Sequence, residues 1–66
     1  MIRNLIEKDW DQIRRQLQMR YPHLGPADLL YVRGQEDALI WRLKQKTRLS
    51  EAELAKFMED AVLATH

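Results

Sequence analysis

The feature that most constrains this chain is the spacing of its apolar residues, which repeat at intervals of three and four near both ends. The first series is Ile6, Trp10, Ile13 and Leu17. The second series is Leu54, Phe57, Met58, Ala61 and Val62. These intervals place side chains on one face of an α-helix, whereas a half-buried β-strand would alternate apolar and polar residues. We therefore expect an all-α fold in which each apolar stripe is covered by another helix.

Local signals near the start predict a first helix over about residues 4–20. Asn4 followed by Glu7 fits a capping box, in which each side chain bonds a backbone amide that the first turn leaves free. Pro22 disfavours helical dihedrals at the residue before it, so the helix should end near Arg20.

A second, short helix is expected over about residues 26–33. Pro26 suits the first turn of a helix, and Gly34 suits its end because glycine readily adopts the left-handed conformation. Its apolar side would consist of Leu29, Leu30 and Val32. A helix this short depends on tertiary packing for its stability.

Two further helices complete the expected fold. One spans about residues 35–47, with acidic residues in its first turn and basic residues near its end, as the helix dipole favours. The other begins after Ser50, which forms a second capping box with Glu53. The prediction is thus a single domain, residues 1–66, of about four short helices that pack as an open array or a closed bundle.

Size and charge limit the classes of function. The core of a 66-residue chain is marginal, and without cysteine neither a disulfide nor a thiolate metal site can support it. Well-capped helices or an oligomer must therefore supply the missing stability. The net charge of +1 disfavours binding to nucleic acid or to an anionic membrane. The sequence contains neither an apolar run of about 18 residues, as a membrane span needs, nor a signal-peptide pattern. We therefore expect a cytoplasmic protein without a membrane partner.

One pattern of residues extends over about positions 6–57. Its members are Trp10, Gln12, Tyr21, Leu24, Asp28, Leu29, Val32, Gly34, Asp37, Leu39, Leu43, Ser50 and Glu53. In register and spacing this pattern resembles the CsbD-like family of small bacterial stress-response proteins. The resemblance implies a helical, non-enzymatic protein of the stress response whose molecular activity is unknown.

The chain departs from that family's pattern at three places. Arg15 and Trp41 stand where the family commonly has glycine, and Thr47-Arg48 replaces a Tyr-Gly pair. One hypothesis is an exchange of volume, in which Trp41 fills core space that Thr47 leaves empty.

Three apolar residues are candidates for a partner surface. Leu30, Ile40 and Trp41 add to what one small core can cover, and an exposed apolar patch is typical of self-association or of binding to a protein. The leading functional hypothesis is therefore a non-enzymatic protein that acts through protein contacts or as a homo-oligomer.

The alternative function is a small nucleic-acid-binding helical module. Its candidate phosphate contacts are Arg42, Lys44, Lys46 and Arg48. Alternate residues spread around a helix and do not form one basic face, so the same residues also fit a solvated helix end.

No pattern of catalytic or metal-binding residues is present. The sequence lacks a glycine-rich phosphate loop, a nucleophile with a nearby base, and an HExxH motif. His23 would need further ligands to hold a metal, and the other histidine is His66. We expect neither an enzyme nor a cofactor, metal or small-molecule substrate.

Overall fold

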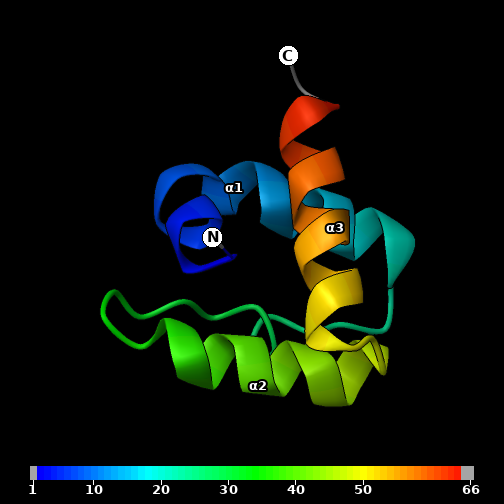
Figure 1. Cartoon of the computed structure of the whole chain (residues 1–66). Coiled ribbons are helices and arrows are strands. Elements are labelled where there is room, and N and C mark those ends of the chain that lie inside the picture. Colours follow the sequence, from blue (N-terminus) through cyan, green and yellow to red (C-terminus); the bar gives the residue numbers. More distant parts are fainter. Residues whose placement is uncertain (1, 65–66) are drawn as a thin grey trace.

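The computed structural model describes residues 2–64, and every regular element in that range is a helix. The helices are α1 (Ile2–Arg20), α2 (Glu36–Thr47) and α3 (Glu51–Leu63). α1 packs mainly against α3, and α2 runs across the end of α3 at which that helix begins (Figure 1). The all-α prediction is confirmed, but the described residues form three helices and not about four.

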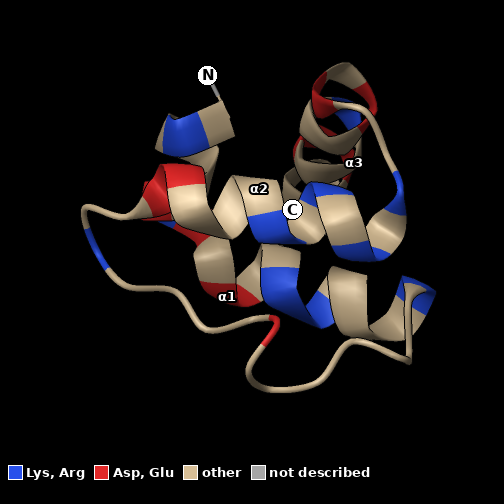
Figure 2. Ribbon diagram, turned by 90° about the horizontal axis from the view of Figure 1, so that it is seen from below, with Lys and Arg blue, Asp and Glu red and all other residues tan. Residues whose placement is uncertain are grey.

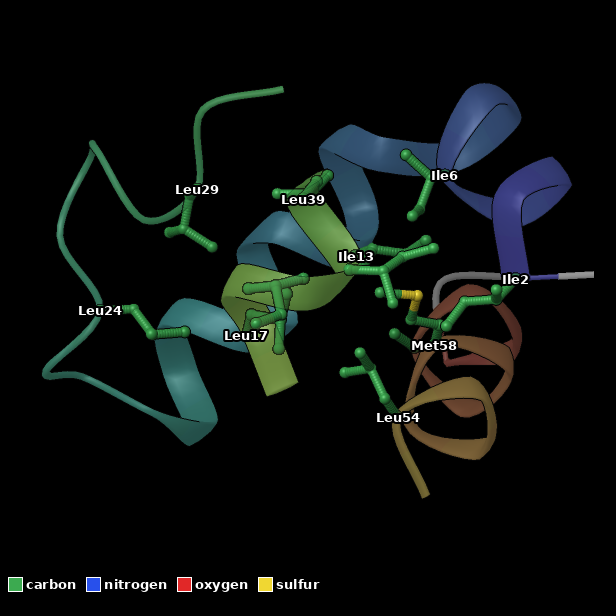
Figure 3. Packing of buried hydrophobic residues seen from close by; sticks show 12 residues of the cluster. Ile2, Ile6, Ile13, Leu17, Leu24, Leu29, Leu39, Leu54 and Met58 are labelled. Atoms are coloured by element: carbon green, nitrogen blue, oxygen red, sulfur yellow. The ribbon is translucent and has the colours of Figure 1, made fainter. Parts of the chain in front are cut away.

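The core lies where the three helices meet, and its side chains point toward one another from all three (Figure 3). Its fully buried large side chains are Ile6, Ile13, Leu17, Leu39, Leu43, Leu54 and Met58. The two apolar stripes predicted from the sequence therefore meet. Trp10 and Phe57 from those stripes are only partly buried and pack against the edge of this cluster.

Helix α1 ends at Arg20 as predicted but begins earlier than expected. Because Ile2 is already helical and buried, Asn4 lies inside the first turn, and the predicted Asn4 cap is wrong. The helix is also kinked at Asp9, whose φ of −132° and ψ of 31° are not helical. Neither proline nor glycine is present at the kink, although aspartate has a low helix propensity.

The predicted helix over residues 26–33 is wrong, because this segment forms isolated turns. The amides of Asp28 and Leu29 donate to the carbonyl oxygens three residues earlier, and the helical pattern does not continue. Only Leu29 of the expected apolar side is buried; Leu30 and Val32 are exposed. A helix here would therefore have had little apolar surface to bury, which is what a helix this short depends on.

A turn around Gly34 leads the chain into α2. The amide of Gln35 donates to the carbonyl oxygen of Val32 (2.9 Å), and Gly34, the third residue of this turn, has a φ of 89°. A type II turn requires a positive φ at its third position, where glycine has no Cβ to clash. Gly34 is thus needed for a turn and not, as predicted, for the end of a helix.

The predicted capping box of the last helix is confirmed. Ser50 Oγ accepts a hydrogen bond from the Glu53 amide (3.1 Å), and a Glu53 carboxylate oxygen accepts one from the Ser50 amide (2.9 Å). Helix α2 ends at Thr47, and the cap residue that follows it, Arg48, adopts the left-handed conformation with a φ of 62°.

Candidate interaction surface

Trp41 lies on the outer side of α2 and is 65% exposed. Because the buried positions of this helix are Glu36, Leu39, Ile40 and Leu43, the helical period turns Trp41 away from the core. The volume-exchange hypothesis, which requires Trp41 to fill core space, is therefore wrong.

Beside Trp41 the surface is hollowed. The hollow has a volume of about 300 Å³, and we call its lining the Trp41 face: Ile2, Arg3, Asp37, Ile40, Trp41, Lys44 and Glu51. Ile2 and Ile40 are almost completely buried and supply apolar surface to it. A second hollow of about 320 Å³ shares Ile2 and Glu51 and adds Ala52 and Ala55 from α3. The apolar lining thus continues from α2 past the start of α1 onto α3.

Two ion pairs, each between two different helices, lie on the Trp41 face. Arg3 of α1 pairs with Asp37 of α2 at 2.5 Å, and Lys44 of α2 pairs with Glu51 of α3 at 4.0 Å. All four side chains are at least one-third exposed, so each pair contributes at most about 1 kcal/mol to stability. Together they leave the face without net charge.

The structure brings two of the three predicted surface residues together. Ile40 and Trp41 both line the hollow. Leu30 is 60% exposed but lies on the connector between α1 and α2, residues 21–35, and does not line the hollow. Sequence reasoning missed Ile2, Arg3 and Glu51, which come from the starts of two other helices. Only the helix packing brings these three residues beside Trp41; the single sequence signal was Ile2 at the edge of the first apolar stripe.

Two of the candidate phosphate contacts hold the connector against α2. The Arg42 guanidinium donates from Nη1 to the carbonyl oxygens of Leu30 (3.1 Å) and Ala27 (3.4 Å). Lys46 Nζ lies 3.6 Å from a carboxylate oxygen of Asp28. These contacts give both cations a role within the chain.

The other two candidate phosphate contacts differ from each other. Lys44 is paired with Glu51, while the exposed side chain of Arg48 makes neither a hydrogen bond nor an ion pair with any described residue. Figure 2 shows acidic residues at the start of α2 and basic residues toward its end, as the helix dipole favours. This arrangement supports the interpretation of Arg42, Lys44, Lys46 and Arg48 as basic residues at a solvated helix end.

A second polar cluster joins the connector to the start of α2. Glu36 Oε2 accepts a hydrogen bond from the Tyr31 hydroxyl (2.5 Å) and another from the Gly34 amide (3.0 Å). The hydrogen bond from Tyr31, and next that from Gly34, lower the pKa of Glu36. The bond to Glu36 is in turn the main reason that the pKa of Tyr31 is raised to about 12. The cluster fixes the turn before α2, because the ionised carboxylate satisfies two donors at once.

The Tyr31 ring also lies 6.0 Å from that of Trp10, next to the kink in α1. These two rings border a hollow of about 400 Å³ whose other lining residues are polar: Glu7, Lys8, Asp9, Asp11 and Gln12. Tyr21 instead packs against Phe57, with ring centroids 5.9 Å apart. Trp10 and Tyr21 thus have different aromatic partners.

The remaining candidates have structural contacts. His23 Nε2 lies 3.1 Å from the carbonyl oxygen of Lys46, and the Ser50 hydroxyl is engaged in its cap. Residues 2–64 contain no cluster of three or more histidine, cysteine, aspartate or glutamate side chains that could hold a metal ion. His66 lies outside the described residues.

Comparisons of this chain with models of protein families, with curated proteins and with solved structures found no match. Within residues 2–64, none of the helices combines the length and the apolar character that crossing a bilayer requires.

Proposed function

We propose that this protein is a non-enzymatic, cytoplasmic bacterial stress-response protein of the CsbD-like kind, which acts through protein contacts at the Trp41 face. The observation that carries the proposal is an exposed tryptophan beside a hollow that Ile2 and Ile40 line together with four charged side chains. Tryptophan is enriched among the residues that dominate binding energy at protein interfaces. A large apolar ring left in water next to a recess it does not fill is typical of a binding surface.

The contacts of the pattern residues support the family resemblance as a likeness of fold. Gly34 occupies a turn with positive φ, Leu24 and Leu39 are buried, and Ser50 and Glu53 cap α3. These roles are structural, so the proposed likeness concerns the fold and does not require a shared activity. Trp41, in contrast, stands where the family commonly has glycine, and the proposed contact surface is therefore a property of this chain.

A site-specific crosslinking experiment tests the proposal. A photo-reactive phenylalanine analogue replaces Trp41 in one variant and Met19 in a control, and both are expressed in bacterial cells before and during heat, acid and salt stress. Met19 is a suitable control because it is an apolar residue of α1 that is 74% exposed and does not line the hollow. We expect a covalent adduct with protein from position 41 and little or none from position 19.

The mass of the adduct identifies what binds. An adduct that is stronger from position 41 supports a contact surface there, and its increase under stress supports the proposed context. Equal yields from the two positions, or no adduct from position 41 under any of these conditions, would refute the proposed function.

A further inference from the structure

The Trp41 face combines a protruding side chain and a recess within one small patch. Trp41 is two-thirds exposed, and the hollow beside it has a volume of about 300 Å³ and apolar surface from Ile2 and Ile40. A twofold-symmetric dimer requires this combination, because the same patch of each copy must be complementary to itself. If two copies meet at this patch, each can place its indole over the recess of the other.

The charges around the hollow narrow the choice of partner. Arg3 and Lys44 contribute two positive charges, and Asp37 and Glu51 contribute two negative charges. A strongly acidic partner such as nucleic acid would face two carboxylates, and a strongly basic partner would face two cations. A surface with the same two cations and two anions can instead pair each charge with an opposite one. A second copy of this chain has that composition.

A weak dimer needs only a small part of the surface of this chain. Weak interfaces bury less than about 1,200 Å² in total, which is about 600 Å² from each copy. That is roughly one-eighth of the 4599 Å² surface of this chain. The continuous lining of the two hollows by α1, α2 and α3 provides a patch that extends beyond Trp41 itself.

From these observations we propose that the occupant of the Trp41 face is a second copy of the chain, in a twofold dimer with each Trp41 seated in the hollow of the other copy. This inference rests on the proposed function, since it names the partner at the same surface. For an interface of this size we expect a dissociation constant in the micromolar range.

The test measures molar mass by light scattering, between about 10 µM and about 1 mM, for the full chain, a Trp41→Ala variant and a Met19→Ala control. The wild type and Met19→Ala should shift from monomer to dimer as concentration rises. Trp41→Ala should raise the dissociation constant at least about 30-fold, as expected for a central aromatic residue of an interface. Circular dichroism checks that both variants retain the helix content of the wild type.

A fluorescence measurement detects association while the Trp41 side chain is kept. In a Trp10→Phe background, Trp41 is the remaining tryptophan, and its emission should move to shorter wavelength as the dimer forms. A wild type that stays monomeric at about 1 mM, well above a micromolar dissociation constant, overturns the proposal. So does association that Trp41→Ala and Met19→Ala weaken equally. A monomer that still crosslinks to a different protein from position 41 overturns the dimer and leaves the proposed function standing.

Discussion

Replacing Arg48 by glycine should stabilise this protein, because Arg48 ends α2 in a conformation that disfavours a side chain. Its φ of 62° and ψ of 19° lie in the left-handed region, where its amide donates to the carbonyl oxygen of Lys44 at 2.9 Å. For a residue with a Cβ, this conformation costs about 1–2 kcal/mol. Glycine avoids that clash and keeps the amide, so the hydrogen bond to Lys44 persists.

The expected magnitude follows from two opposing terms. Glycine gains about 1–2 kcal/mol from the absent Cβ and loses about 0.5–1 kcal/mol through the greater entropy of its unfolded chain. The net stabilisation is about 0.5–1 kcal/mol, which for a domain of this size raises the melting temperature by about 2–8 °C. The Arg48 side chain is exposed and without a partner among the described residues, so its removal leaves no gap in the packing.

The matched control is Arg48→Ala, which removes the same charge from the helix end but retains a Cβ. Thermal unfolding followed by circular dichroism compares the two variants directly, so that the loss of the favourable cation–dipole interaction cancels. The glycine variant should melt several degrees above the alanine variant. Equal melting temperatures would mean that position 48 carries no conformational strain, and the reasoning would be refuted.

Four other predictions follow from the core, the polar cluster and the charge. Leu43→Ala should lower the free energy of unfolding by about 2–5 kcal/mol in urea titrations, whereas the exposed Leu63→Ala should change it by less than about 0.5 kcal/mol; similar values would contradict the observed core. The pKa of Glu36 is lowered in the folded state, so its contribution to stability is full above the unfolded value of 4.5 and is lost as the pH falls below that value. Glu36→Gln should therefore reduce the loss of stability that acid causes. An unchanged dependence of stability on acid pH would contradict this. The pKa of Tyr31 is raised, so its contribution to stability is full below pH 10 and is lost as the pH rises toward about 12. The titration of Tyr31 can be followed by the absorbance of its phenolate, as the difference between the wild type and a Tyr31→Phe variant. In gel-shift assays at low salt we expect no retardation of DNA or RNA, because the net charge is +1 and Arg42, Lys44 and Lys46 contact other groups of the chain. Retardation under these conditions would favour the nucleic-acid-binding alternative.

The parts of the fold that depend on neighbouring residues were predictable from the sequence. The end of α1 before Pro22 and the cap of α3 by Ser50 and Glu53 are each decided within one turn of the chain. The buried stripes were predictable for a similar reason, since a helix repeats every 3.6 residues wherever it packs. These features make the class of fold accessible without coordinates.

The missing helix shows where such reasoning fails. Residues 26–33 carry acceptable helix signals, but carbonyl oxygens in this segment bond Arg42, and Tyr31 bonds Glu36. Those partners lie on α2, and their geometry depends on tertiary packing. The hollow beside Trp41 was unpredictable for the same reason, because Ile2 and Glu51 contribute to it from two other helices.

The connector formed by residues 21–35 has a consequence for anyone who modifies this protein. Leu24 and Leu29 anchor it in the interior, and Asp28 and Tyr31 bind it to α2. Exchanging it for a glycine-serine tether of equal length would keep all three helices and yet remove two interior leucines. Peptide tags, fluorescent fusions and circular permutation, which surface loops usually accept, therefore belong elsewhere in this protein.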